Sequence, residues 1–274
     1  MAPSLTAPSH TASSHAPIQP EHSAQHRDVE RQFGPVAAAY LTSTPHAQGA
    51  DLQRVGESFR DQPHARVLDL GCGAGHLSFA IAAHVSEVVA LDLSPEMLGT
   101  VDAEAARRGL GNVRSCEAAV ESLPFDDHSF DAVCTRFSAH HWADVPRALA
   151  EVRRVLRPGG RLVVIDIVGH ATPVFDTRLQ AIEMLRDGSH ARNHSVAEWQ
   201  VLLLQAGFRP GAVSTWPLPI DFEAWISRMR TPADHVAVIR GLLRAAPEGF
   251  QRHYGVQPDQ SFSLDVGCFE ASPM

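Results

Sequence analysis

The sequence predicts an α/β protein built on a doubly wound, mostly parallel sheet of seven strands. Between residues 65 and 168, short and continuously apolar segments alternate with segments whose apolar residues recur at helical spacing. Continuous apolar strands are typical of parallel sheets that helices cover on both faces. In addition, the first apolar segment runs directly into a glycine-rich turn. Such sheets bind their ligands outside the carboxyl ends of the strands.

Length and composition limit the kind of protein. A chain of 274 residues allows one large domain, or one domain with a cap. The net charge of −8, without a dense Lys/Arg block, argues against a large nucleic-acid-binding surface. No apolar run is long enough to span a bilayer, and the N-terminus has no apolar signal core. The four cysteines form no Cys-x-x-Cys pair. We therefore expect a cytoplasmic protein with no metal site and no disulfide framework.

The N-terminal region divides into two parts. Residues 1–26 contain almost no large apolar groups, so we expect a disordered tail. Residues 27–62 have helical spacing, with a break at Gly34-Pro35 and a second helix from about residue 46. These helices precede the first strand and are expected to lie across the mouth of the site. Phe33 and Tyr40 either line a cofactor pocket there or only pack.

The stretch from residue 66 to residue 76 predicts a strand, a turn and the start of a helix. Alternating glycines at 71, 73 and 75 remove side chains from the turn, so a ligand can lie against bare amide groups. The helix that follows adds the positive end of its dipole. The stretch is therefore expected to form a nucleotide-like binding corner.

The residues of this corner limit the class of ligand that it can bind. The spacing is Gly-x-Gly-x-Gly, whereas the dinucleotide fingerprint requires Gly-x-Gly-x-x-Gly. Asp69, inside the end of the strand, would repel a pyrophosphate but suits an ammonium group. A ligand with a ribose and an amine but no phosphate at the turn fits, and S-adenosylmethionine is such a ligand. A tight turn that binds nothing is the alternative, and the downstream residues disfavour it.

The second strand, at residues 87–91, ends in Asp92, about twenty residues after the first glycine. An acid at this place can bind both ribose hydroxyls. Its alternative role, capping the next helix, is better filled by Ser94. Further strands are expected at residues 113–117, 130–135, 161–168, 213–218 and 261–270. Further helices are expected to begin at residues 95 and 144 and to span residues 175–187, 196–206, 222–229 and 236–245.

Five stretches in the correct order resemble class I S-adenosylmethionine-dependent methyltransferases, of the group that includes the ubiquinone/menaquinone C-methyltransferases. They are Val67-Leu68-Asp69-Leu70-Gly71-Cys72-Gly73-Ala74-Gly75, Asp92, Glu121-Ser122-Leu123-Pro124-Phe125, Ser129-Phe130-Asp131 and Leu156-Arg157-Pro158-Gly159-Gly160. The resemblance covers roughly residues 65–168 and is specific for the fold and the cofactor, but not for the substrate. It implies a Rossmann-like methyltransferase fold whose last strand is antiparallel.

The resemblance also implies roles for individual residues. Asp69 and Gly71 would hold the methionine end of the cofactor in the turn formed with Gly73 and Gly75. Asp92 would bind the ribose. Leu93 would pack on the adenine.

The loop before residue 123 would bracket the adenine edge. Many relatives carry Asp two residues before Glu121, where this chain has Ala119 followed by Val120. Adenine recognition is therefore expected from backbone groups of this loop or from Glu121. The loop that carries His140 and His141 would lie beside the transferred methyl group. One of these histidines acts as a general base or merely orients the loop, and many methyl transfers need only proximity and alignment.

We therefore predict a cytoplasmic methyltransferase that acts on a small molecule. Its domain would span 27–274, with N-terminal cap helices at 27–62, a cofactor-binding core at 65–168 and substrate-cap helices within 172–250. The alternatives are a nucleic-acid or protein methyltransferase, an NAD(P)-dependent oxidoreductase and a non-catalytic protein that binds S-adenosylmethionine. The sequence does not specify the acceptor, the methylated atom (oxygen, nitrogen or carbon) or the oligomeric state.

Overall fold

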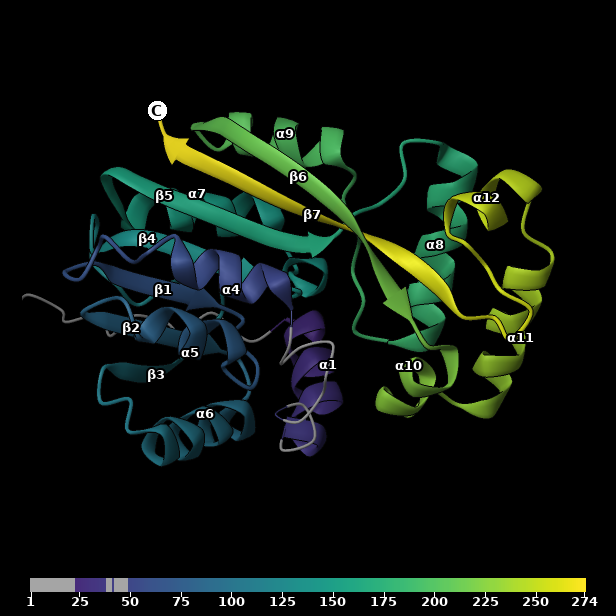
Figure 1. The fold of residues 1–274 in the computed structure, drawn as a ribbon, viewed down its shortest axis with the longest axis horizontal. Coiled ribbons are helices and arrows are strands. Elements are labelled where there is room, and N and C mark those ends of the chain that lie inside the picture. Colours follow the sequence, from purple (N-terminus) through teal and green to yellow (C-terminus); the bar gives the residue numbers. More distant parts are fainter. Residues whose placement is uncertain (1–22, 38–40, 42–48) are drawn as a thin grey trace, which may run out of the picture.

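The computed structural model describes residues 23–37, 41 and 49–274, and these residues form one seven-stranded sheet (Figure 1). Its strand order is β3-β2-β1-β4-β5-β7-β6. The strands are β1 (Arg66–Leu70), β2 (Glu87–Asp92), β3 (Val113–Glu117), β4 (Phe130–Arg136), β5 (Leu156–Ile167), β6 (Phe208–Ile220) and β7 (Phe262–Pro273). The first five are parallel, and β7 runs antiparallel between β5 and β6. The predicted fold class is confirmed.

The register of the sheet brings the predicted site residues to one edge. Leu70, at the end of β1, pairs with Leu91 of β2 and Thr135 of β4. Asp92 and Arg136 come next along these strands, so they lie beside the turn that follows Leu70. The four residues 67–70 are all buried because helices cover both faces of the sheet.

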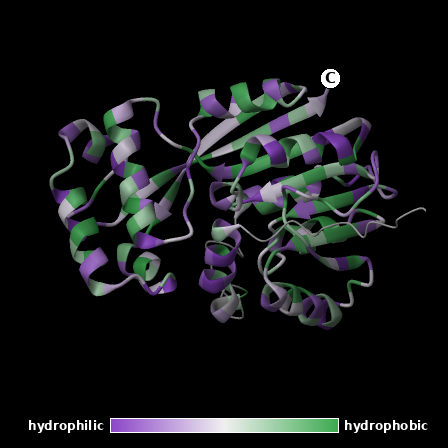
Figure 2. Ribbon diagram, turned by 180° about the vertical axis from the view of Figure 1, so that it is seen from behind, coloured by the Kyte–Doolittle hydropathy of each residue, from purple (hydrophilic) through white to green (hydrophobic). Residues whose placement is uncertain are grey.

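Two sets of helices cover the sheet. The helices of the described chain are α1 (Ala24–Phe33), α4 (Ala50–Glu57), α5 (His76–Ala82), α6 (Pro95–Arg108), α7 (Val145–Val155), α8 (Pro173–Arg186), α9 (Val196–Gln205), α10 (Phe222–Arg228), α11 (Ala233–Arg244) and α12 (Glu248–His253). Helices α4, α5 and α6 share a buried apolar cluster on one face, and α7 and α9 share another on the opposite face. Hydrophobic and hydrophilic residues alternate along these helices, as amphipathic helices require (Figure 2).

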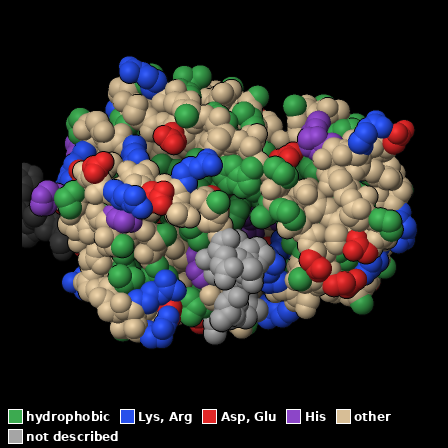
Figure 3. Space-filling model, viewed as in Figure 1, with side chains coloured by type: hydrophobic (Ala, Val, Ile, Leu, Met, Phe, Trp, Pro, Cys, Tyr) green, Lys and Arg blue, Asp and Glu red, His purple; other side chains and the backbone are tan. Residues whose placement is uncertain are grey.

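The cap is a second lobe built around the far ends of β6 and β7 (Figure 1). Helices α8, α10, α11 and α12 surround these strand ends, and Ile220, Trp225, Ile239 and Phe250 are buried among them. By contrast, α9 lies in the predicted cap range but packs against α7 and the sheet. Hydrophobic side chains gather where the two lobes meet (Figure 3).

The largest differences from the sequence predictions are at the starts of α1, β5 and β6. Helix α1 begins at Ala24, capped by the Ser23 hydroxyl, so the predicted disordered tail is wrong for residues 23–26. Strand β6 extends five residues upstream of its predicted start, across a register shift between Pro210 and Val213 that an edge strand tolerates. Strand β5 likewise starts at Leu156 and not at residue 161. The predictions for residues 1–22, for Tyr40 and for a helix start near residue 46 lie outside the described residues.

Two further features bear on the class of protein. The four cysteines all lie in the described part of the chain, and each is unpaired. Among the described residues, no helix is long and apolar enough to cross a membrane.

Candidate functional site

Three glycines after β1 are required for three different reasons. All have positive φ: +63° at Gly71, +52° at Gly73 and +85° at Gly75. A side chain on Gly71 would clash with the Ser138 hydroxyl, and one on Gly75 would lie 2.8 Å from Phe79. A side chain on Gly73 would meet no protein atom within 4 Å. Gly71 and Gly73 line a large cavity, whereas Gly75 serves the packing of the α5 N-terminus.

Two acids stand beside this turn and line the same cavity, the buried Asp69 and the half-buried Asp92. Asp69 is 1% exposed and accepts a 2.6 Å hydrogen bond from the Ser78 hydroxyl. Burial raises the pKa of Asp69 to about 7. Asp92 accepts hydrogen bonds from the amides of Gly73 (2.8 Å) and Ser94 (3.0 Å). Burial raises its pKa, although these amide hydrogen bonds oppose the shift. Asp92 therefore ties the ends of β1 and β2 together.

The turn side of the cavity is completed by apolar residues that follow β2 and β3. Leu93, Met97, Ala118 and Val120 line it together with the two acids and the glycine turn. The other predicted contact in this region, Glu121, also lines the cavity, but its carboxylate is already engaged. Its Oε1 accepts from the amides of Ala143 (2.9 Å) and Asp144 (3.2 Å), and its Oε2 lies 3.1 Å from Nε2 of His26.

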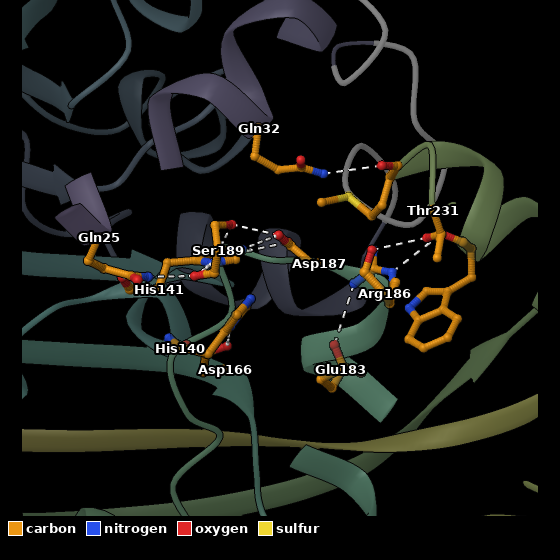
Figure 4. Close-up of polar contacts among 12 residues, drawn as sticks. Gln25, Gln32, His140, His141, Asp166, Glu183, Arg186, Asp187, Ser189 and Thr231 are labelled. Carbon is orange, nitrogen blue, oxygen red and sulfur yellow. Dashed lines mark hydrogen bonds and ion pairs between the residues drawn. The ribbon is translucent and has the colours of Figure 1, made fainter. Parts of the chain in front are cut away.

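The loop after β4 brings a histidine and a buried carboxylate together at the cavity. Nδ1 of His140 lies 2.5 Å from Oδ1 of Asp166, and the His140 amide donates to Oδ2 at 3.0 Å (Figure 4). Asp166 is 1% exposed and also accepts from the Ile167 amide. Because the carboxylate only accepts, it fixes the proton on Nδ1 of His140 and leaves Nε2 as the acceptor. For Nε2, the described residues provide no hydrogen-bond partner.

The pKa values of His140 and His141 are shifted in opposite directions. Burial favours the neutral ring of His140, but the Asp166 carboxylate outweighs it and raises the pKa of His140 above its ordinary value. Burial and the adjacent His140 lower the pKa of His141 to about 4. Nδ1 of His141 lies 3.0 Å from the Ser189 carbonyl, to which it donates. Both histidines line the cavity, but His141 is neutral at neutral pH and holds the loop after α8.

The cap side of the cavity is formed by side chains that are distant in sequence. The residues that line this side are Phe33 from α1, Phe137 from the loop after β4, Glu183 and Arg186 from α8, Asp187, Trp225 from α10, and Met229. Phe137 has a φ of +53°, a rare conformation for a non-glycine residue that also occurs at functional sites. The polar residues His190, Arg192 and His194, which follow α8, do not line the cavity.

Several of these residues were missed at the sequence level. Asp166 lies in a strand read as continuously apolar, and a lone acid in such a run is the signal that could have identified it. Glu183 follows Leu179 by one helical turn on α8, so its face could have been identified as buried.

Comparison with known proteins agrees with this geometry. The model of a methyltransferase domain matches residues 68–164. An uncharacterized Escherichia coli protein, YafE, is 43% identical over 73% of this chain and 97% of its own length. A demethylmenaquinone methyltransferase of Clavibacter sepedonicus is 33% identical over 85% of this chain and 95% of its own.

A structure of a similar protein has also been solved. YcgJ of Bacillus subtilis, described as an uncharacterized methyltransferase, is 37% identical over 88% of this chain and 96% of its own. Its crystal structure superposes with a TM-score of 0.78, covering 81% of this chain and 97% of that one. The cavity, with its glycine turn and paired acids, therefore lies in a fold that these relatives share. The chain belongs to the S-adenosylmethionine-dependent methyltransferases, and S-adenosylmethionine is its cofactor.

Proposed function

We propose that this protein transfers the methyl group of S-adenosylmethionine to a small molecule bound on the cap side of the cavity, and that His140 accepts the proton which the acceptor loses. The observation that carries the proposal is the His140–Asp166 pair, which lines the same cavity as the glycine turn. The cofactor supplies an electrophilic methyl group on a sulfonium. The chain then has to bind the cofactor, align the acceptor and remove a proton.

The turn side of the cavity suits the cofactor. The Asp69 carboxylate would hold the ammonium of the methionine end beside Gly71 and Gly73, and Asp92 would accept from the ribose hydroxyls. Leu93 and Val120 would flank the adenine. Oε1 of Glu121 already accepts from two amides and its Oε2 pairs with His26, whereas, among the described residues, each oxygen of Asp92 accepts from only one amide. Backbone groups of residues 118–120 would therefore recognise the adenine edge. Tyr40 remains part of this proposal from the sequence alone.

The His140–Asp166 pair provides a base in the correct tautomer. Asp166 keeps the proton on Nδ1, so Nε2 of the neutral ring can accept a proton from the acceptor. The carboxylate then stabilises the imidazolium that forms. His141 would position the loop through its hydrogen bond to Ser189. An orienting role for His140 alone is the rival interpretation, since alignment suffices for many methyl transfers.

Helix α1 favours a small acceptor over a nucleic acid or a protein. The Gln25 side chain donates to the carbonyls of His141 (3.0 Å) and Ser189 (2.5 Å), and Gln32 donates to the Met229 carbonyl (Figure 4). The ring centroids of Phe33 and His141 lie 5.0 Å apart, in an edge-to-face arrangement. The helix thus joins the core to the cap beside the cavity, and a macromolecular target would have to displace it.

The names of relatives agree with a small acceptor, because the Clavibacter relative is named for demethylmenaquinone. We propose a cytoplasmic location, supported by the four unpaired cysteines.

A labelling experiment tests the proposal. The protein is incubated with methyl-deuterated S-adenosylmethionine and with separate small-molecule, RNA and protein fractions of a bacterial extract. We expect label in the small-molecule fraction, and mass spectrometry then identifies the product. Label confined to RNA or protein would contradict the proposal, and cofactor binding without any transfer would favour a non-catalytic binding protein.

A further inference from the structure

A buried carboxyl group on the cap side has an oxygen that no described residue satisfies. Glu183 is 4% exposed and lines the cavity from α8. Its Oε2 lies 3.5 Å from Nη1 of Arg186 (Figure 4), while its Oε1 has no hydrogen-bond partner among the residues that the structure describes. Buried polar atoms are satisfied in the large majority of cases, so such an atom beside a cavity indicates a ligand group.

The charges around Glu183 indicate what that group is. Three arginines (Arg136, Arg186 and Arg228) and the acids Asp69, Asp92 and Asp187 line the same cavity, and the Arg186 guanidinium lies beside the Glu183 carboxyl group. A cationic ligand group at Glu183 would meet the positive charge of Arg186. Burial raises the pKa of Glu183, so its neutral acid form is favoured relative to an exposed Glu. A hydroxyl group can donate and accept, so it pairs with a carboxyl group in either protonation state.

The walls around this position are apolar and aromatic. Phe33, Trp225 and Met229 line the cap side, and the Arg186 guanidinium stacks over the Trp225 ring at 4.5 Å. These side chains would enclose an apolar body, preferably a flat one, while polar contacts are left to its ends.

We infer that Glu183 binds a hydroxyl group of the acceptor other than the atom that loses its proton to His140. The acceptor is then a neutral, mainly apolar molecule with two polar groups, and Glu183 is a specificity-determining residue. The inference rests on the proposed function, because it takes the cap side as the acceptor site.

Binding of simple probes tests this inference without knowledge of the natural acceptor. The protein is saturated with S-adenosylhomocysteine, and 2-naphthol, 2,6- and 2,7-dihydroxynaphthalene and 2-(aminomethyl)naphthalene are titrated by calorimetry. We expect the better dihydroxy probe to bind at least about tenfold more tightly than 2-naphthol, as a satisfied buried hydrogen bond provides. The ammonium probe should bind most weakly.

Variants then assign the preference to Glu183. Glu183→Leu should abolish the difference between the dihydroxy and monohydroxy probes, whereas Glu183→Gln, of nearly the same shape, should retain part of it. The control is Glu248→Leu, at an exposed position on α12. Melting curves with S-adenosylhomocysteine identify any variant that does not fold.

Three results would overturn the inference: no binding of any naphthol, equal affinities of the wild type for the one- and two-hydroxyl probes, or a preference that persists in Glu183→Leu. Tightest binding of the ammonium probe would contradict the neutral hydroxyl. These failures are distinct from failure of the proposed function, which would appear as an absence of labelled small molecules.

Discussion

The two sides of the cavity are built in different ways. The turn side is made of backbone amides and acids at the carboxyl ends of adjacent strands, and its residues are close in sequence to the strands that carry them. The cap side is made of side chains from α1, α8, α10 and the loop after β4. A sheet edge fixes the first arrangement, whereas the second depends on how a separate lobe packs. One fold can therefore keep its cofactor while the acceptor changes.

The largest expected effect on the turn side comes from Gly73→Val. The added side chain would project into the cavity at a position where no protein atom lies within 4 Å, so it would occupy the place of the cofactor. We expect S-adenosylmethionine binding to fall below detection by calorimetry. Gly109→Val is the matched control, since Gly109 also has positive φ (+70°) and open space around it but does not line the cavity. Loss of binding in both variants would show a general effect of backbone strain.

On the cap side, the largest expected effect comes from His140→Gln. Glutamine keeps some hydrogen bonding but cannot exchange the proton, so turnover should fall on the order of 10²–10⁴-fold. The affinity for S-adenosylmethionine should stay close to that of the wild type, because the residue acts on the acceptor. His64→Gln, at an exposed position, is the control. A nearly unchanged turnover would assign His140 an orienting role.

A smaller effect is expected for Asp92→Ala on the turn side. The ribose hydroxyls would lose their acceptor, which weakens cofactor binding by about 1–3 kcal/mol. Calorimetry measures this effect, and Asp102→Ala on the outer surface of α6 is the control. Since Asp92 also joins the ends of β1 and β2, the melting temperature of the free protein has to be compared. An Asp92→Ala protein with normal affinity would contradict the ribose contact.

The smallest expected effect concerns Asp69 and pH. Because the pKa of Asp69 is raised to about 7, the folded protein holds this proton more tightly than the unfolded chain does. Its contribution to the stability of the free protein is therefore lost as pH rises from about 4 to about 7. The affinity for the ammonium of the cofactor should rise over the upper part of this window, by roughly tenfold, as the carboxylate forms.

Calorimetry between pH 5.5 and pH 8 measures this change. Asp69→Asn should remove it, since the amide cannot ionise yet still accepts from Ser78. A wild-type affinity that does not change with pH would show that the Asp69 carboxylate does not act on the ammonium.

The same division between the two sides explains what the sequence could predict. The turn and its acids follow from residues 66–92 alone, because strand, glycine turn and helix are local features. The placement of His140 beside the methyl group was implied by the family resemblance. Asp166 was missed because its strand was read as uniformly apolar. On α8, Glu183 shares its buried face with Leu179 and Ile182. Periodicity can predict that this face is buried, but it cannot indicate that part of the face lines a cavity.

Helix α1 illustrates the same limit. The cap at Ser23 and the contacts of Gln25 and His26 lie in a segment whose composition predicts disorder. Gln25 contacts Ser189 and His26 contacts Glu121, each more than 90 positions away in sequence. These long-range contacts form only in the folded chain.

The most direct test of the central claim is the pH–rate profile of methyl transfer, measured for the wild type and for Asp166→Asn with the acceptor identified by labelling. His140 must be neutral to accept a proton, and Asp166 raises its pKa, so wild-type turnover should rise with pH to a plateau, with a midpoint above about 6.5. In Asp166→Asn the midpoint should move to lower pH, because the group that raises the pKa is gone, and the plateau should fall. Profiles with the same midpoint, or a wild-type rate independent of pH, would contradict a His140 base held by Asp166.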